Sequence, residues 1–319
     1  MPRSFGYPSF LSTRGVVRVV AAVLLLAVAS LAAATGETRT LRVRHYTVAD
    51  GLPQNAVTAV AEDRLGFVWL GTQDGLVRFD GRRFREFRTD EGSVHLVTVI
   101  ASAPDNTLWV GTTEGLYVVD ADRRGITAID DEEIGEGEVA DIEITDDGTV
   151  YVALPTKGVF RGIDAGEGEF ERWIGTRGVR GVGIAEDGDA RFFITGDFGT
   201  AEVRVDASGV DAVGIDAVPG RAIVTMRDGT PVVGGDESLR ALRRSGGSYD
   251  VREIESGLAV TAMSIDRFDR LWVGTRTRGV LRYDETVEER VEYRAAPGKG
   301  SLRSDNISAL YVDSTNVLW

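Results

Sequence analysis

The chain has 319 residues, no cysteine, and 36 Lys+Arg against 50 Asp+Glu, which gives a formal charge of −14. The lack of thiols excludes disulfide-stapled mini-proteins, zinc fingers and cysteine-dependent enzymes. A surface this acidic repels phosphate backbones, so we expect no nucleic-acid partner. Hydrophobic residues make up 43% of the chain, enough for a substantial core, which excludes global disorder.

The first 34 residues have the composition of an export signal. Arg3, Arg14 and Arg18 occur without any acid, and an uncharged run of sixteen residues follows from Val19 to Ala34, ending in three alanines. This order is typical of a signal peptide with its cleavage site. A membrane-spanning helix needs about 20 apolar residues. We predict a cleaved signal in residues 1–34, with a retained N-terminal membrane anchor as the alternative; either way the remainder is exported.

A repeat of about 40 residues organises the rest of the chain. Its best-preserved copy runs from Val57 to Asp80 and contains Trp-Leu-Gly-Thr at 69–72. The equivalents of Trp69 are spaced by 40, 42, 42, 39 and 40 residues; they are Trp109, Tyr151, Phe193, Val232 and Trp272. A seventh copy begins at Ile307 and reaches Trp319. A fixed period of this length indicates a repeat architecture.

Each copy has the pattern of four short strands. Val57, Ala59 and Ala61 alternate with more polar neighbours, and Asp-Gly pairs at 147–148, 187–188 and 228–229 stand where a hairpin needs positive φ. Four antiparallel strands in about 40 residues make one blade of a β-propeller. We therefore predict an all-β fold over residues 41–319, a seven-bladed β-propeller of four-stranded antiparallel blades that is incomplete in this chain, with six complete blades and a truncated seventh.

Closure of the ring requires the two ends of the chain to meet. Residues Leu41 to Val48 alternate apolar and polar, and we expect them to supply the outer strand of the last blade. The second strand of that blade stops at Trp319. Because a missing wedge leaves unpaired strand edges, we expect this sequence to be the front part of a longer chain.

The string Tyr46-Thr-Val-Ala-Asp-Gly-Leu-Pro-Gln-Asn-Ala-Val57, followed by Asp63, Trp69 and Gly71-Thr72, resembles the two-component-regulator propeller repeat. The resemblance covers nearly everything after residue 40. It is specific in copies one, two and six and in the half copy at the end. It is degenerate in copies three to five, where the Gly71 position is taken by Ala153, Thr195 and Gly234.

This family forms the exported sensor region of bacterial hybrid histidine kinases and membrane diguanylate cyclases. The resemblance implies sensing of an extracytoplasmic small molecule or glycan fragment, with no cofactor and no metal, by a periplasmic propeller tethered to the inner membrane. It also implies a transmembrane helix and an output domain that this sequence does not contain. Catalysis would then belong to that output domain, and a homodimer is left open.

Strand direction predicts which loops share a face. The segment before each first strand and the turn between second and third strands open on the same side of a propeller, and loops on a rigid scaffold are the usual home of recognition. The candidate ligand-binding residues on this face are Gln54, Asn55, Gln73, Asp74, His95, Glu114, Arg180, Arg276 and Arg278. No catalytic residue is predicted.

Two alternative functions remain open. Streptogramin-type lyases are propellers that need a histidine base beside metal-bound acids, and His95 is the one histidine that we expect near the funnel. A protein-interaction scaffold of the cell envelope is the other.

Several conspicuous residues have simpler structural interpretations. We expect the periodic tryptophans to pack between blades rather than to stack on sugars. Asp63, Asp266 and Asp313 should fix hairpins through side-chain to backbone hydrogen bonds. Trp173 lies outside the period, and we expect it on the surface. The acidic run 130–138 lacks the glycine-centred alternation of a calcium loop, which favours a solvated loop.

Overall fold

The computed structural model describes residues 43–319 apart from 90–91, 165–167, 186–190, 207–208 and 299. The predicted export segment 1–34 lies outside these residues. Within the described part of the chain, no helix combines the length and the apolar character that crossing a membrane requires.

The described residues form six antiparallel sheets, which we call blades 1 to 6. Blade 1 contains β1 (Val57–Glu62), β2 (Val68–Thr72), β3 (Leu76–Phe79), β4 (Phe84–Thr89) and β5 (Gly92–Ser93). Blade 2 contains β6 (Val97–Ser102), β7 (Leu108–Thr112), β8 (Leu116–Val119) and β9 (Ile126–Ala128). Blade 3 contains β10 (Asp141–Ile144), β11 (Val150–Leu154), β12 (Gly158–Asp164) and β13 (Glu169–Ile174). Blade 4 contains β14 (Val179–Ala185), β15 (Arg191–Gly196), β16 (Gly199–Asp206) and β17 (Gly209–Asp216). Blade 5 contains β18 (Ala222–Thr225), β19 (Pro231–Gly234), β20 (Ser238–Ser245) and β21 (Ser248–Ser256). Blade 6 contains β22 (Val260–Ile265), β23 (Leu271–Thr275), β24 (Val280–Tyr283) and β25 (Arg290–Tyr293).

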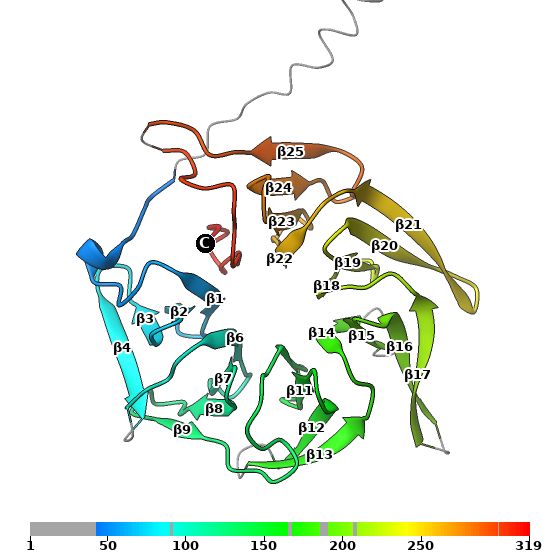
Figure 1. Cartoon of the computed structure of the whole chain (residues 1–319), viewed down its shortest axis with the longest axis horizontal. Coiled ribbons are helices and arrows are strands. Elements are labelled where there is room, and N and C mark those ends of the chain that lie inside the picture. Colours follow the sequence, from blue (N-terminus) through cyan, green and yellow to red (C-terminus); the bar gives the residue numbers. More distant parts are fainter. Residues whose placement is uncertain (1–42, 90–91, 165–167, 186–190, 207–208, 299) are drawn as a thin grey trace, which may run out of the picture. The chain divides into compact units, whose positions relative to one another are not determined.

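Each blade runs up and down from an inner first strand to an outer last strand, and the blades follow one another about a central channel (Figure 1). Neighbouring first strands contact each other, β1 with β6 and so on to β18 with β22. One short 3-10 helix, η1 (Val48–Asp50), precedes the first blade. The prediction of an all-β propeller with four-stranded antiparallel blades is confirmed.

The predicted number of blades is wrong: the structure has six blades, not seven. The described residues of the segment 294–319 form no sheet, and their bridges are limited to Ala295 with Leu302 and Val312 with Leu318. The segment nevertheless packs beside β22 and β1. Its Ile307 N–H donates to the Thr275 carbonyl, and its Ser308 hydroxyl donates to the Val57 carbonyl. A single short hairpin provides too few backbone partners for a blade.

The predicted outer strand at Leu41–Val48 is also not formed in its described part. Residues 43–47 have no strand pairing. Tyr46 instead contacts Trp319, with ring centroids 6.2 Å apart, and His45 Nε2 lies 3.0 Å from the Ser301 carbonyl. Side-chain contacts rather than a β-ladder therefore bring the start and the end of the described chain together.

The periodic tryptophans are core residues, as predicted. Trp69, Trp109 and Trp272 are 0%, 3% and 7% exposed. The indole N–H of Trp69 donates to Asp63 at 2.8 Å, and that of Trp272 donates to Asp266 at 3.0 Å. The same aspartates accept backbone N–H groups of their hairpins, which confirms the predicted role. The indole contact, which we call the Asp–Trp latch, was not predicted.

The hairpins between the first and second strands need a residue in the left-handed region three positions before the ring position. Gly66, Asn106 and Asn316 have φ of 81°, 71° and 68°. Gly148 and Gly229, the predicted Asp-Gly turns, have φ of 89° and 78°. The pair at 187–188 lies outside the described residues. Glycine and asparagine are the residues that adopt this conformation most readily.

Close approach between blades explains the Gly-Thr part of the repeat. A Cβ on Gly71 would lie 2.4 Å from Val97 of blade 2, and one on Gly234 would lie 2.5 Å from Val260 of blade 6. Between blades 4 and 5 the small and the large residue change places. Thr195 of blade 4 takes the glycine position, and Gly220 takes the valine position before blade 5. A Cβ on Gly220 would lie 2.1 Å from the Thr195 hydroxyl. Each interface therefore pairs one small residue with one larger residue.

The expectation for Trp173 is wrong. This side chain is 8% exposed and packs on Tyr151 and Phe192, with ring centroids 4.7 and 5.0 Å apart. Tyr151 takes the periodic ring position in blade 3 but is smaller than tryptophan. A second aromatic ring from the outer strand fills the space between the sheets of blades 3 and 4, a role that repeat counting could not reveal.

Candidate functional site

The first strands line the central channel, which encloses a cavity of about 380 Å³. All six blades contribute to its wall, together with the C-terminal segment through Ser308, Ala309, Leu310 and Tyr311. The channel is therefore the place where residues from every repeat come close together.

One repeat position, that of Thr58, decides the polarity of the channel wall. Hydroxyl groups occupy it in blades 1, 2 and 6 and in the C-terminal segment. They belong to Thr58, Thr98, Thr261 and Ser308. The hydroxyl of Thr58 donates to the Val97 carbonyl at 2.5 Å, and that of Thr98 donates to the Val139 carbonyl at 2.5 Å. These contacts link neighbouring blades and leave this half of the channel without charge at that position.

Arginines occupy the same position in blades 4 and 5. Arg180 lies 3.3 Å from Glu138 and 3.7 Å from Asp197, both on loops of the predicted face. Arg221 lies 2.7 Å from Asp236, which also contacts Arg276 at 3.1 Å. We call these three arginines and three acids the charged mouth.

The charged mouth is electrostatically coupled although it is open to solvent. The Arg221 side chain is 50% exposed and that of Asp236 is 46% exposed. A hydrogen bond from Arg221 lowers the pKa of Asp236, and the same contact raises the pKa of Arg221. Exposed pairs of this kind contribute little to stability. Their guanidinium and carboxylate groups can therefore exchange partners at low cost.

Asp141 lies in the channel wall of blade 3, one position after the Thr58 equivalent. Its carboxylate accepts the N–H of Val182 in blade 4 at 2.9 Å and its neighbour Ile142 at 3.0 Å. Burial of the carboxyl group raises the pKa of Asp141 to about 6. Glu143 lines the same cavity. Blade 3 thus adds two acidic residues to the channel that blades 1, 2 and 6 lack.

The prediction that two kinds of loop share one face is confirmed by backbone hydrogen bonds. The Leu96 N–H, before β6, donates to the Gln73 carbonyl in the β2–β3 turn at 3.0 Å. The Gly220 N–H, before β18, donates to the Gly196 carbonyl in the β15–β16 turn at 3.0 Å. The loops that precede one blade therefore lie beside the second turn of the blade before it.

The structure brings only some of the predicted ligand-binding residues together. Arg180 and Arg276 belong to the charged mouth, and Gln54 contacts Gln73 at 3.4 Å. The side chain of Asn55 accepts the Val48 N–H at 3.0 Å, which gives it a structural role. Among the predicted residues, Asp74, His95 and Glu114 have exposed side chains without a described partner.

Arg278 does not face the channel. Its guanidinium contacts Glu255 on β21 and Glu292 on β25, the latter at 2.8 Å. Both strands are the outermost of their blades. Hydrogen bonds from the arginines lower the pKa of Glu292 to about 2 despite the opposing effect of burial. Arg278 therefore joins the rims of blades 5 and 6 and does not belong to the charged mouth, and its role as a ligand contact stays a prediction.

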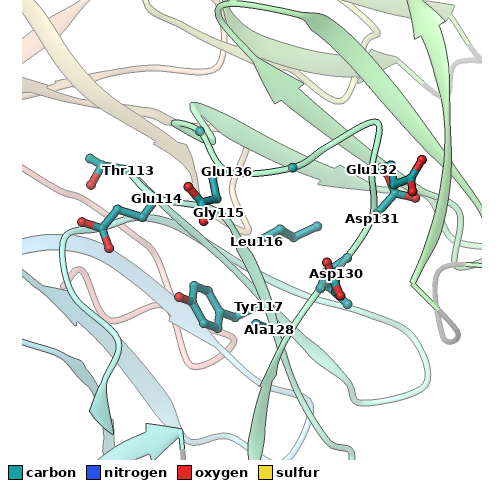
Figure 2. Close-up of a pocket in the computed structure, with 13 residues that line it drawn as sticks. Thr113, Glu114, Gly115, Leu116, Tyr117, Ala128, Asp130, Asp131, Glu132 and Glu136 are labelled. Carbon is teal, nitrogen blue, oxygen red and sulfur yellow. The ribbon is translucent and has the colours of Figure 1, made fainter. Parts of the chain in front are cut away.

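Glu114 lies in a separate acidic pocket between blade 2 and the loop 129–137, with a volume of about 860 Å³. In Figure 2 the side chains of Glu114 and Asp130 lie on separate sides of this pocket and do not converge. Asp131 accepts backbone N–H groups of Glu133, Ile134 and Phe170, so it shapes the loop. Among the described residues no group of three or more His, Asp or Glu side chains could hold a metal ion.

Repeat alignment would have found three of the four residues of the charged mouth that the prediction missed. Arg221 stands 41 residues after Arg180, in the same period position. Asp197 and Asp236 both follow the second strand of their blades, as Gln73 does. Glu138 has no such signal, because it lies in an irregular loop.

Comparison with known proteins supports the repeat assignment. Residues 51–74 match the family model described as two component regulator propeller, so the chain carries this repeat. Histidine kinase P4 of Formosa agariphila is 40% identical over 47 residues, which are 15% of this chain and 3% of that protein.

Solved structures share the fold at low sequence identity. The extracellular domain of a protein assigned as a hybrid two-component system of B. thetaiotaomicron, BT3049, has a TM-score of 0.73 at 18% identity, covering 88% of this chain and 40% of that one. PorZ of Porphyromonas gingivalis, a surface component of the type-IX secretion system, has a TM-score of 0.61 at 16% identity, covering 83% and 45%. A streptogramin B lyase has a TM-score of 0.66 at 11% identity, covering 84% and 91%. This chain spans less than half of the first two structures.

Proposed function

We propose that this chain, which carries two-component-regulator propeller repeats, is the periplasmic sensor region of a bacterial signal-transduction receptor and acts by binding rather than by bond-making. The observation that carries the proposal is the charged mouth, where blades 4 and 5 have Arg180 and Arg221 in place of the neutral hydroxyl groups of the repeat. The repeat needs no charge at this position, since Thr58 and Thr98 link their blades to the next through neutral hydroxyl groups.

The chemistry of the charged mouth suits a small polar ligand. Its guanidinium groups donate several hydrogen bonds, and the carboxylates of Glu138, Asp197 and Asp236 accept them. A ligand rich in hydroxyl groups, such as a glycan fragment, could satisfy both kinds of group. Inner-membrane tethering and a cytoplasmic output domain complete the proposal.

Ligand binding would transmit a signal only by preferring one arrangement of the receptor. The Arg221–Asp236–Arg276 chain joins blade 5 to blade 6, and Arg180 joins blade 4 to the loop before blade 3. A ligand that takes over these partners would change how neighbouring blades are held. We propose this exchange of ion-pair partners as the event that biases the rest of the receptor.

A thermal-shift screen of glycan fragments against the purified propeller tests the proposal. A ligand at one hundred times its dissociation constant should raise the free energy of unfolding by about 2.7 kcal/mol. Arg221→Ala should weaken this ligand at least tenfold. Arg172→Ala is the matched control, because its side chain is similarly exposed, at 53%, and pairs with Glu133 away from the mouth. Equal loss in both variants would contradict the proposed site.

A lyase or hydrolase is the second candidate, since the fold is shared with a streptogramin B lyase. His95 is exposed and does not line the channel cavity. Metal-dependent turnover that His95→Ala abolishes would replace the sensor proposal. A protein captured from envelope extracts, together with no ligand shift, would instead favour a scaffold.

A further inference from the structure

Two rings of residues line the central channel, one below the other. The repeat position of Thr58 forms the upper ring, next to the loops that precede the first strands. The position two residues further along each first strand forms the lower ring, about 7 Å deeper in the channel. The lower ring is apolar in every blade, and its members are Val60, Ile100, Ile142, Val182, Ile223 and Met263.

The lower ring places an apolar band beneath the two arginines of the upper ring. Ile142, Val182 and Ile223, in blades 3 to 5, are 4%, 2% and 7% exposed. Glu143 follows this ring and also lines a pocket with Arg227 near the first hairpins, at the end of the channel away from the charged mouth. Because apolar side chains offer no hydrogen bond, a polar group that enters from the mouth finds its side-chain partners in the upper ring.

In the upper ring, the arginines are the side chains that keep donors for a ligand. Three hydroxyl groups of this ring donate their hydrogen to a backbone carbonyl, those of Thr58, Thr98 and Ser308. The hydroxyl oxygen of Thr261 is buried, and Ala140 has no polar side chain. Arg180 and Arg221 belong to neighbouring blades, whose first strands β14 and β18 contact each other beside the channel (Figure 1).

The acids that pair with these two arginines lie outside the cavity. Glu138, Asp197 and Asp236 belong to the charged mouth but not to the lining of the channel. Arg221 meets Asp236 through Nε at 2.7 Å, and Arg180 meets Glu138 through Nη1 at 3.3 Å. A guanidinium group has five N–H donors, so both arginines keep donors for a group inside the channel. Two neighbouring guanidinium groups with free donors favour an anionic oxygen group.

The acids around the channel limit the charge of that group. Asp141 lines the cavity one residue after Ala140, and its carboxylate accepts the N–H groups of Val182 and Ile142 at 2.9 and 3.0 Å, which directs it at the wall. Together with Glu143 and the acids of the mouth, it would repel a ligand with several negative charges. A single carboxylate suits the site, because it accepts two parallel N–H bonds from a guanidinium group.

We infer that the ligand of the charged mouth is a hydroxylated monocarboxylate, such as a sugar acid. Its carboxylate binds Arg180 and Arg221 inside the upper ring, and its hydroxyl groups donate to Glu138, Asp197 and Asp236 outside the cavity. The apolar band below strengthens the pairing, since a hydrogen bond is stronger where the local dielectric is low. This inference rests on the proposed function, that the charged mouth binds a ligand, and adds the chemical class of that ligand.

Matched pairs of probes test the carboxylate with the protein as it is. D-Glucuronate, D-galacturonate and D-gluconate are each compared with their neutral amide by isothermal titration calorimetry. At least one of these acids should bind at least tenfold more tightly than its amide. Arg180→Ala and Arg221→Ala should each remove this difference, whereas Arg172→Ala, which lies away from the mouth, should keep it.

A carboxylate built into the upper ring gives a second measurement. Ala140→Asp adds an acid at a half-buried residue of blade 3, beside blade 4 and its Arg180, where it would compete with the ligand for the guanidinium group. We expect it to weaken binding of the acid at least tenfold. Ala121→Asp makes the same substitution at an exposed residue of blade 2 and should leave binding within twofold.

The outcomes separate this inference from the proposed function. Equal binding of every acid and its amide, with both lost in Arg221→Ala, would overturn the monocarboxylate class and leave the ligand site in place. An acid–amide difference that survives in both arginine variants, unchanged binding in Ala140→Asp, or no binding of any of the three acids would also overturn it. If neither acids nor glycan fragments respond to Arg221→Ala, the proposed function fails as well.

Discussion

Blades 1 and 6 and blades 3 to 5 build the same four-stranded sheet in different ways. In blades 1 and 6 a buried aspartate holds the tryptophan and the hairpin together. Blades 3 to 5 have Tyr151, Phe193 and Val232 at the ring position, and Trp173 fills space in blade 3. A propeller blade therefore needs the space between neighbouring sheets to be filled, and the identity of the side chain that fills it can vary.

The channel-facing residues differ between the same two groups of blades. The blades with the strictest core motif present neutral hydroxyls to the channel, whereas blades 3 to 5 present Asp141, Glu143, Arg180 and Arg221. The blades that keep the repeat least are therefore those that differ most in surface chemistry.

Removing the latch from a regular blade should have the largest effect. Asp266 is 3% exposed and accepts the Trp272 indole, the Arg270 guanidinium and two backbone N–H groups. Asp266→Ala leaves these donors unpaired, and we expect a loss of about 3–5 kcal/mol in the free energy of unfolding. Denaturant unfolding measures it, with exposed Asp250→Ala on β21 as the control. A loss below about 1 kcal/mol would show that the latch does not support the blade.

The exchanged packing between blades 4 and 5 offers a double-mutant cycle. Gly220→Val alone places a side chain against the Thr195 hydroxyl, and overpacking should cost about 3 kcal/mol. Thr195→Gly with Gly220→Val restores the glycine–valine order of the other interfaces and should recover at least half of that loss. Additive losses in the double variant would contradict the size-exchange explanation.

The raised pKa of Asp141 in the channel wall predicts that stability depends on pH. Its pKa of about 6 lies above the ordinary aspartate value, so the folded state holds the proton more tightly than the unfolded state. This group therefore costs stability as pH rises from about 4 to 6, by about 3 kcal/mol in all. Asp141→Asn should raise the melting temperature relative to the parent more at pH 7.5 than at pH 4.5. An equal difference at both pH values would contradict the raised pKa.

The smallest effect is expected at the charged mouth. Asp236→Asn weakens the contacts of Arg221 and Arg276, but the pairs are exposed, so stability should change by less than about 1 kcal/mol. Urea unfolding measures this change. A loss comparable to that of Asp266→Ala would assign the mouth a structural role instead.

Much of the fold could be predicted from single residues of the repeat. The ring position of Trp69, the aspartate six residues before it and the Asp-Gly turns are local signals, because each acts within one hairpin. Contacts between blades were harder to predict from the sequence. The burial of Trp173 depends on a ring from the next blade, and Arg278 reaches an outer strand of the preceding blade.

The sequence by itself determined the strands, their antiparallel order and the face on which the loops gather, since these follow from alternation, turn residues and a 40-residue period. The tertiary structure alone decided how many blades the described residues form and which arginines meet the channel. Those outcomes depend on residues far apart in the chain, such as Ser308 with Val57 or Trp319 with Tyr46, and on how much space the neighbouring sheets leave between them.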